Sequence, residues 1–330
     1  MKKNDKLNIL FTNVGRRVSV IHAFKEAMTR LGVSGQILGV DANPLSPAYY
    51  VTDQSFPICH ISNEEYIPAL LDICRREEVQ ILISLIDTDL LKLAENRKLF
   101  SNHGIFVVIS SPEVIRLARN KVLTANFFKE NEIPTPRILS YAEAWQENCF
   151  PLFIKPLDGS ASNFVFRIES HRCLEFLYQY VPNPLVQEYI PGQEVTLDLF
   201  IDLKGKVRAV VPRKRLEVRA GEVSKSQIVL DAKILADGQR VAAALAKRGG
   251  IGVINVQAIY TTEGEGKFIE INPRFGGGSP LSIKAGYPFP QWIIEMVLGK
   301  DLASIPGNLG DGLTMLRYDE AIFIQHDEKA

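Results

Sequence analysis

The sequence predicts an α/β protein that begins with a parallel sheet and continues with antiparallel ones. Three observations support this fold class. Uniformly apolar stretches alternate with amphipathic ones over the first third of the chain, Pro134 and Pro136 interrupt that pattern, and apolar–polar alternation follows residue 194. A chain of 330 residues is also longer than one hydrophobic core usually supports. We therefore expect two or three domains.

Composition excludes several classes of function. The 38 Lys and Arg residues balance 38 Asp and Glu residues, so no net charge favours a general binder of nucleic acids or anionic membranes. No apolar run approaches the roughly 20 residues of a membrane span, and the N-terminal apolar stretch is too short for a signal peptide. Four cysteines without metal-ligand spacing indicate free thiols. We expect a soluble, cytoplasmic protein whose partners are neither nucleic acids nor membranes.

The first third of the chain alternates predicted strands and helices. Apolar stretches predict strands at 7–14, 35–41, 79–86 and 105–110, and amphipathic spacing predicts helices at 17–31, about 63–77 and about 88–100. Such strands form a parallel sheet covered on both faces, and ligands bind beyond their carboxyl ends. The candidate substrate-binding residues at those ends are Gly15, Arg16, Asp41, Asp87 and Asp89.

The loop after the first strand, NVGRRVS (13–19), has more than one interpretation. It carries one glycine where the dinucleotide fingerprint GxGxxG needs three, which argues against a nicotinamide cofactor. Arg16 and Arg17 either hold an anionic group of a substrate or lie in a solvated helix start. Asp41 follows the second strand, where an acid often contacts a ribose, but the missing glycine turn weakens that interpretation.

A linker and a smaller α/β unit follow near residue 120. We expect a helix at 120–131 that ends before Pro134 and Pro136, because two prolines in three residues forbid its continuation. Strands are predicted at 151–155, 163–168 and 185–190, and a helix at about 170–180. The small residues of the loop 158–162 suit either an ordinary hairpin turn or a phosphate-binding loop. Lys155, at the mouth of this loop, favours a polyphosphate site.

The pattern becomes antiparallel after residue 194. Strands are predicted at 194–202, 207–218, 252–260 and 266–272, with a helix near 233–248. In the second of these strands Arg213, Arg215, Glu217 and Arg219 fall on one face. A solvated basic face is the interpretation that this spacing normally favours.

The loop 261–266 predicts a hairpin whose register places polar residues opposite one another. If the turn is centred between residues 263 and 264, Gln257 faces Glu270 and Asn255 faces Asn272. Glu270 and Asn272 also share a face because they are two residues apart. The hairpin therefore brings three oxygen-bearing side chains together.

This cluster of Gln257, Glu270 and Asn272 has two interpretations. Hard cations such as Mg²⁺ prefer oxygen ligands, and a nucleotide would supply the further negative oxygens that one carboxylate and two amides lack. The alternative is a polar, wetted sheet face with Ile269 and Ile271 packed on the other side. Arg274 and the glycine-rich segment FGGGSP (275–280) follow directly, and a glycine-rich helix start beside an arginine is typical of an anion site.

The order of these motifs resembles the ATP-grasp superfamily, and within it the carbamoyl-phosphate-synthase large-subunit-like group. The motifs are Lys121, FIKP (153–156), the loop 158–162, QEYIPGQEVTLD (187–198) and FIEINPRFGGG (268–278). The resemblance covers essentially the whole chain and implies an ATP-grasp fold. It divides the chain into a Rossmann-like pre-ATP-grasp domain (1–118), a small α+β lid subdomain (119–190) and an antiparallel α+β domain for metal and nucleotide (191–330).

The resemblance also implies roles for individual residues. The nucleotide-binding residues that it implies are Lys121, Lys155, Asp158, Gly159, Ser160, Gln187, Glu188, Ile190, Glu194 and Lys225. Among these, the lysine at 155 matches the α- and β-phosphate contact, residues 187–190 match the adenine hinge, and Glu194 matches the ribose contact. Gln257, Glu270 and Asn272 match ligands of Mg²⁺, with Mn²⁺ as an alternative ion. The implied catalytic residues are Lys155, Arg215 and Arg274.

Two departures from the family pattern bear on function. The adenine hinge usually begins with an acid, and Gln187 stands there instead, although its amide can still accept a hydrogen bond from the adenine amino group. The chain also has room for one ATP-grasp unit, whereas the large subunit of carbamoyl-phosphate synthase has two. We therefore do not expect it to make carbamoyl phosphate alone.

The implied activity is that of an ATP-dependent carboxylate–amine ligase that works through an acyl phosphate and releases ADP and phosphate. Arg16 would bind a substrate carboxylate and the acids at 41, 87 and 89 an amine, so an amino acid would satisfy both. A homodimer is an assembly typical of the family. The alternatives are a non-catalytic ATP-binding module and a nicotinamide-dependent dehydrogenase built on the first domain.

Overall fold

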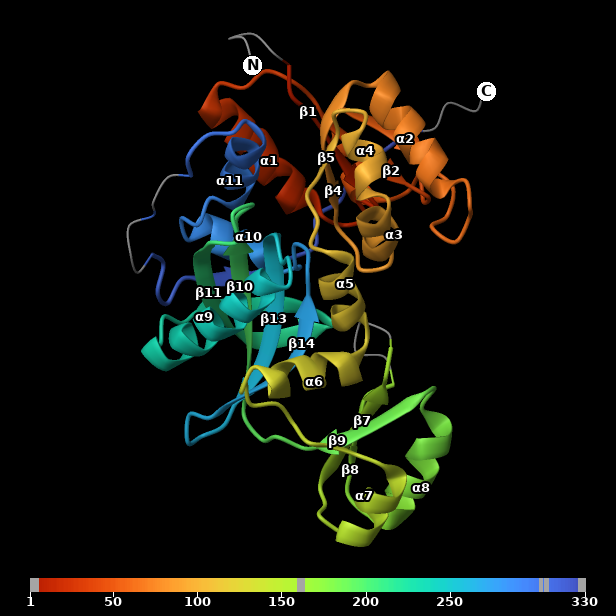
Figure 1. Ribbon diagram of the computed structural model, residues 1–330, viewed down its shortest axis with the longest axis vertical. Helices are drawn as coiled ribbons and strands as arrows, with labels where there is room; N and C mark the ends of the chain where they lie inside the picture. The colour runs from red at the N-terminus through yellow and green to blue at the C-terminus, as the bar shows by residue number, and fades with distance from the viewer. Residues whose placement is uncertain (1–5, 159–163, 303–304, 306–308, 326–330) are drawn as a thin grey trace.

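Three sheets succeed one another along the chain in the computed structural model, which describes residues 6–158, 164–302, 305 and 309–325 (Figure 1). The first sheet is parallel, and the second and third are antiparallel. The predicted α/β fold class is therefore confirmed. Among the described residues, no helix is both long and apolar enough to cross a membrane.

The first sheet is built from residues 8–107, and all of its strands run in the same direction. In spatial order it contains β3 (Gln54–Pro57), β2 (Ile37–Asp41), β1 (Asn8–Thr12), β4 (Val79–Ser84) and β5 (Phe106–Val107). Its helices are α1 (Val18–Leu31), α2 (Tyr66–Arg76), α3 (Leu90–Glu95) and α4 (Arg97–Ser101), with a 3-10 turn η1 (Pro47–Tyr50). The helix predicted at about 88–100 is divided into α3 and α4 at Asn96.

The two faces of this sheet pack against different parts of the chain. Alternate residues of β1 point to opposite sides, so Phe11 packs against α1 while Leu10 joins the cluster that contains α2 and α3. On the α1 side, the ring of Phe24 lies 4.9 Å from that of Phe11 and 5.8 Å from that of Phe275. Because Phe275 follows β14 far along the chain, the first sheet and the C-terminal part share one core.

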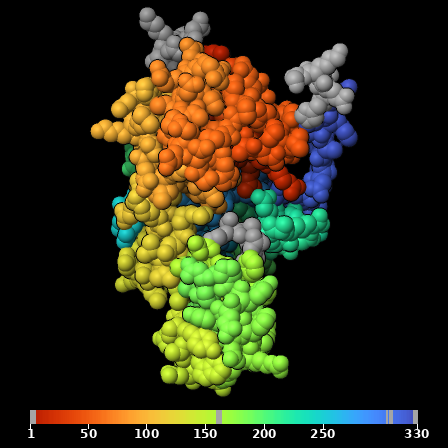
Figure 2. All heavy atoms as spheres, turned by 90° about the vertical axis from the view of Figure 1, so that its right-hand side faces the viewer, coloured from red at the N-terminus to blue at the C-terminus, as the bar shows by residue number. Residues whose placement is uncertain are grey.

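The second sheet is small and has its own core. It contains β6 (Ile138–Leu139), β9 (Pro184–Glu188), β7 (Leu152–Pro156) and β8 (Phe166–Ile168), covered by α7 (Tyr141–Glu147) and α8 (His171–Tyr180). Leu152, Ile154, Leu174 and Val186 are buried in a cluster that includes no residue of the other two sheets. This unit forms a separate lobe of the molecule (Figure 2).

The third sheet carries the predicted hairpin. In spatial order it contains β14 (Gly266–Asn272), β13 (Gly252–Tyr260), β10 (Gln193–Ile201), β11 (Val207–Arg219), β12 (Glu222–Ile228) and β15 (Thr314–Leu316). The helices beside it are α5 (Pro112–Arg119), α6 (Lys121–Glu130), α9 (Ala232–Lys247), α10 (Ser279–Lys284) and α11 (Phe289–Val297). The helix predicted at 120–131 is α6, and it packs on this sheet: the ring of Phe128 lies 5.7 Å from that of Phe268.

Candidate active site

The β13–β14 hairpin pairs its polar residues as the sequence predicts. Gln257 lies opposite Glu270, and Asn255 lies opposite Asn272. With its amide oriented to satisfy both ends, Gln257 donates to Glu270 Oε2 at 3.2 Å and accepts from Arg215 Nη1 at 3.1 Å. The three predicted metal-ligating side chains therefore come from adjacent positions on two neighbouring strands.

We expected the arginines of β11 to form a solvated basic face. That expectation is wrong for Arg213 and Arg215. Arg213 is buried and donates to both oxygens of Asp198, at 3.0 and 3.1 Å. The side chain of Arg215 is 9% exposed, and its Nε lies 3.2 Å from Glu194 Oε1. Burial raises the pKa of Glu194, and the charge of Arg215 opposes that shift. Only Arg219, beyond irregularities in the β11–β12 pairing, lies in solvent.

Two lysines face Glu270 from the small sheet and the linker helix. Lys155, at the end of β7, is 8% exposed, and burial lowers the pKa of its ammonium to about 8, with Glu270 opposing the shift. Within the described part of the chain, this ammonium has no hydrogen-bond acceptor and no ion-pair partner within 4.0 Å. Lys121, at the start of α6, donates to the carbonyl of Leu157 at 3.3 Å, and burial lowers its pKa too.

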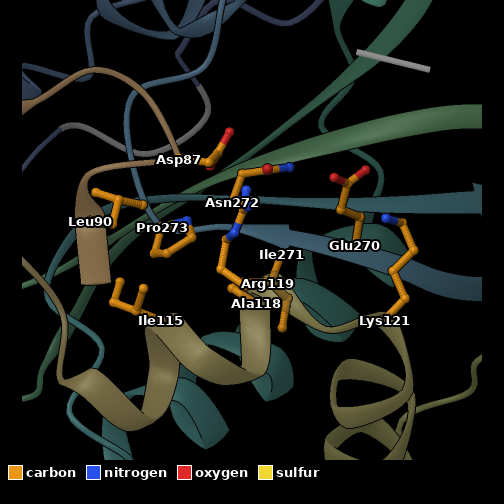
Figure 3. A pocket seen from close by; sticks show the side chains of 10 residues that line it. All are labelled: Asp87, Leu90, Ile115, Ala118, Arg119, Lys121, Glu270, Ile271, Asn272 and Pro273. Atoms are coloured by element: carbon orange, nitrogen blue, oxygen red, sulfur yellow. The ribbon is translucent and has the colours of Figure 1, made fainter. Parts of the chain in front are cut away.

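The pocket beside Glu270 is shown in Figure 3. It is lined by Asp87, Leu90, Ile115, Ala118, Arg119, Lys121, Glu270, Ile271, Asn272 and Pro273. The side chains of Glu270 and Lys121 approach one another at one end, and Asn272 and Asp87 lie at the other (Figure 3). Arg274 donates to Asp87, and its Nη2 lies 3.5 Å from Asn272 Oδ1. Asp87 is therefore the predicted substrate-side acid that contacts the motif at 268–278, through Arg274.

Gln187 and Glu188 end strand β9 of the second sheet, and Ile190 lies in the connection to the third sheet. Gln187 and Ile190 are buried, whereas the side chain of Glu188 is 42% exposed and its Oε2 accepts from the backbone N–H of Arg137. The chain from the end of β9 to the start of β10 makes no sheet pairing. The backbone N–H and C=O groups of residues 189–190 therefore take no part in the hydrogen-bonded pairing of β9 or β10.

Three of the predicted substrate-side residues have structural roles. Asp89 is fully buried and accepts from Thr12, Ser84, Asn13 and Tyr66, so it stabilises the end of the first sheet and does not face the pocket. Asp41 accepts from the backbone N–H groups of Gly15 and Asn43 and holds the loop after β1. Gly15 has φ +49°, which suits that turn.

Two predicted cations lie away from Glu270. The side chain of Arg16 is 73% exposed and pairs with the exposed Asp319, so the solvated interpretation holds for Arg16. The side chain of Lys225 is 45% exposed and its ammonium pairs with Glu217 at 2.6 Å on the β11–β12 hairpin. Neither geometry resembles a phosphate contact. Asp158 accepts from Asn183 at 3.4 Å, and Gly159 and Ser160 lie outside the described residues.

Sequence reasoning missed other residues that converge near Arg274. Arg17 and Arg317 both pair with Glu222, each at 3.0 Å. Arg17 was one of two adjacent arginines that the pattern could not distinguish. Glu222 begins β12, and Arg317 follows β15. Neither strand was predicted from the sequence, so nothing in the sequence pointed to these two residues.

The residues present suit a nucleotide with a divalent cation better than a metal alone. No group of three or more His, Cys, Asp or Glu side chains in the described ranges could hold a metal ion. Glu270 with two amides supplies oxygen ligands but a single negative charge, so polyphosphate oxygens are needed to complete the shell of a hard cation. The buried ammonium of Lys155 supplies the matching positive charge for such an anion.

Comparison with known proteins agrees with this geometry. Residues 118–278 match the ATP-grasp domain family, and residues 9–108 match the PylC-like N-terminal domain family. The chain carries an ATP-grasp domain. The ATP-grasp match spans α6, the second sheet and the third sheet as far as the glycines after Arg274.

Individual ATP-grasp relatives are distant. The chain is 31% identical to a D-alanine–D-alanine ligase of Gloeobacter violaceus over 112 residues, which are 30% of this chain and 37% of that protein. It is 22% identical to a carbamoyl-phosphate synthase of Methanobrevibacter smithii over 223 residues, 64% of this chain and 60% of that protein. The chain thus spans between about a third and three fifths of the length of these relatives.

The fold comparison covers almost the entire chain. The biotin carboxylase domain of 2-oxoglutarate carboxylase from Hydrogenobacter thermophilus, solved with MgADP, ADP and bicarbonate, superposes with a TM-score of 0.75. The match covers 94% of this chain and 74% of that one at 16% sequence identity. At that identity the likeness establishes the ATP-grasp fold, and the predicted fold is confirmed.

Proposed function

We propose that the protein is an ATP-dependent carboxylate–amine ligase that forms a carbon–nitrogen bond and releases ADP and phosphate. The observation that carries this proposal is the buried Lys155 ammonium, which faces Glu270 without an ion-pair partner within 4.0 Å in the described chain. A buried charge of this kind is costly unless an anion compensates it. The triphosphate of ATP is such an anion.

The nucleotide and its cation would be held by residues of the second and third sheets. Lys155 and Lys121 would bind the phosphates, residues 187–190 the adenine, and Glu194 the ribose. Asp158, Gly159 and Ser160 remain proposed phosphate-side residues, and Lys225 is the least supported of the set because it is paired with Glu217. Gln257, Glu270 and Asn272 would hold Mg²⁺ or Mn²⁺.

The proposed reaction has two steps. A carboxylate oxygen of the acid attacks the γ-phosphorus of ATP, and the bond from that phosphorus to the bridging oxygen of ADP breaks. An amine nitrogen then attacks the acyl carbon, the carbon–oxygen bond to phosphate breaks, and the nitrogen loses a proton. The metal ion, when bound, neutralises developing charge on the phosphate oxygens.

The side chains contribute mainly position and charge. Arg274 is held by Asp87, with both side chains less than 15% exposed, so its guanidinium is fixed before substrates arrive. Arg215 links Glu194 to Gln257 and so connects the ribose side to the metal side. Positioning of this kind is what phosphoryl transfer requires of a protein.

The division at 118/119 and 190/191 and a homodimeric assembly are further parts of the proposal. The first boundary has support in the ATP-grasp match, which starts at residue 118. One of the compared structures is a biotin carboxylase domain dimer, which motivates a test of oligomeric state.

The decisive experiment follows ATP turnover with Mg²⁺ and pooled amino acids and small carboxylic acids, measuring ADP, AMP and phosphate. We expect ADP and phosphate that depend on a member of the pool. Glu270→Ala should abolish turnover, while Glu265→Ala, in the exposed turn of the same hairpin, should not. AMP and pyrophosphate would contradict the acyl-phosphate route. Tight ATP binding with no turnover on any substrate would favour a non-catalytic ATP-binding module.

A further inference from the structure

A second pocket lies at the glycine-rich segment that follows Arg274, where three distant segments meet. Arg17 comes from the loop after β1, Gly277 from the glycine-rich segment after β14, and Arg317 from the residue after β15. The C-terminal segment lies beside the first domain on this side of the molecule (Figure 2). The site described above uses neither Arg17 nor Arg317, so the pocket is chemically unexplained.

The backbone of Gly277 shows how closely the two arginines converge. A Cβ at this position would lie 3.0 Å from Arg17 Nη1, 3.2 Å from Glu222 Oε2 and 3.3 Å from Arg317 Nη1. A side chain here would require these groups to shift by a few tenths of an ångström, so glycine leaves the most room for both guanidinium groups. Two positive groups are therefore built into one small space.

Glu222 is the resident counter-ion of this pair. Its Oε1 lies 3.0 Å from Arg17 Nη2, and its Oε2 accepts from Arg317 Nη1 at 3.0 Å. In the described ranges, Arg17 Nη1 and Arg317 Nη2 have no hydrogen-bond acceptor. The Glu222 carboxylate thus faces two guanidinium groups that each retain an N–H group without an acceptor in the described ranges. Its position also shows that a carboxylate fits between Arg17 and Arg317.

The charge of Arg17 also interacts with that of Arg274, in the proposed reaction centre. Burial lowers the pKa of Arg17, Glu222 opposes that shift, and the charges of Arg274 and Arg317 add to it. Arg274 is in turn bound to Asp87, which lines the pocket beside Glu270. The charges of Arg17 and Arg274 are therefore close enough to act on one another.

We propose that Arg17 and Arg317 bind a carboxylate of the substrate that does not itself react, with Glu222 holding the two guanidinium groups side by side until that carboxylate arrives. The inference rests on the proposed function for the reaction at Arg274. It adds a substrate class: molecules that carry an anionic carboxylate in addition to the reacting group. Charge-assisted bonds from two arginines give such recognition its strength and its geometry.

Calorimetric titration of the full chain at low ionic strength tests this with glutarate as the anionic probe and glutaramide as its neutral counterpart. We expect glutarate but not glutaramide to bind. Arg17→Gln and Arg317→Gln should each weaken glutarate binding by about tenfold or more, and Glu222→Gln should strengthen it. Arg76→Gln, an exposed arginine on α2, is the matched control and should change nothing.

The outcomes separate this inference from the proposed function. Equal glutarate affinity in the wild type, Arg17→Gln and Arg317→Gln overturns it, as does absence of binding to both the wild type and Glu222→Gln. The two arginine variants are independent tests, because Arg17 begins α1 beside the first sheet, whereas Arg317 follows β15 at the edge of the third sheet. Binding of a non-hydrolysable ATP analogue with Mg²⁺, measured in the same samples, should be unchanged. Its failure in the wild type would remove the proposed function and leave the anion site standing.

Discussion

At the scale of single residues, the site depends on a buried positive charge that the described part of the chain leaves without an ion-pair partner. Lys155 is the clearest case, because its ammonium is buried at the end of β7 and its pKa is lowered from 10.5 to about 8. A lowered lysine pKa means that the folded state disfavours the charged form. The same group that would hold a phosphate therefore destabilises the protein without one.

Replacing Lys155 by Met should move stability and nucleotide binding in opposite directions. At pH 7 the variant should unfold with a free energy on the order of 2 kcal/mol higher than the wild type. The gain should shrink as pH rises through about 8 toward 10.5, because the wild-type ammonium then loses its proton. Urea unfolding at pH 7 and pH 10 measures this, and affinity for an ATP analogue should fall at least about tenfold at pH 7.

Lys129→Met, on the exposed side of α6, is the control for this experiment and should alter neither quantity. Wild-type nucleotide affinity should also weaken above about pH 8, since binding then requires uptake of a proton, and the Met variant should lack that dependence. If Lys155→Met is less stable than the wild type at pH 7, the claim that the buried Lys155 charge destabilises the folded protein is wrong.

The sequence could not separate residues of one type that lie close together. Asp87 and Asp89 follow the same strand, yet Asp87 binds Arg274 at the pocket and Asp89 is buried under four donors. Arg16 and Arg17 differ in the same way, with one in solvent and one against Glu222. Direction is set by the local turn, here with Asn13 and Gly15 at positive φ, which residue type alone does not reveal.

At the scale of elements, the β13–β14 hairpin pairs Gln257 with Glu270 as predicted, although the prediction did not include a bulge beside Gln257. Near the turn, Tyr260 pairs with Gly266, one position off the predicted register, and an irregularity next to Gln257 restores the predicted partner Glu270. This bulge also puts Phe268 into the core beside Ile271, while Ile269, expected there, is half-buried. A strict period of two cannot foresee a bulge.

The elements that the sequence did not predict share a physical reason. The β12 strand (222–228) is mostly polar because it lies near a sheet edge, and α11 (289–297) is apolar on nearly every side because the shared core surrounds it. Short pieces such as β3 and β6 are stabilised by neighbouring strands rather than by their own pattern. The predicted strands with strong patterns, such as 252–260, are confirmed with their bounds.

The glycine-rich segment after β14 gives a prediction at this scale. A Cβ at Gly276 would lie 1.9 Å from Asn255 Oδ1, and Asn255 donates to the buried Asp198. We expect Gly276→Ala to lower the free energy of unfolding by roughly 3 kcal/mol, because it displaces a buried hydrogen-bonded amide. Chemical denaturation measures the change.

Gly264→Ala is the matched control in the turn of the same hairpin. Its φ is +79° and no atom would lie within 4 Å of the new Cβ, so only backbone strain of about 1 kcal/mol is expected. Equal losses for the two variants would mean that contact with Asn255 is not what requires glycine at 276.

At the scale of the whole molecule, one hydrophobic core is shared between the first sheet and the C-terminal part, and another belongs to the small sheet alone. Phe24 of α1 packs against Phe275, and Trp292 of α11 joins the same cluster, so the first sheet and the C-terminal helices stabilise each other. The small sheet is closed around Leu174 and its neighbours without help from either. The candidate site lies between these units, with Lys155 supplied by one and Glu270 by the other.

Hydrogen exchange on two core variants should reveal this division. Phe24→Ala should cost about 3–5 kcal/mol and reduce amide protection in both β1 and α11, because one core connects them. Leu174→Ala should cost about 2–4 kcal/mol and reduce protection only within residues 138–188. Each variant serves as the control for the other, and the shared core is refuted if Phe24→Ala leaves α11 protected. Leu174→Ala should nevertheless weaken binding of an ATP analogue, since the strand that carries Lys155 belongs to the unit it loosens.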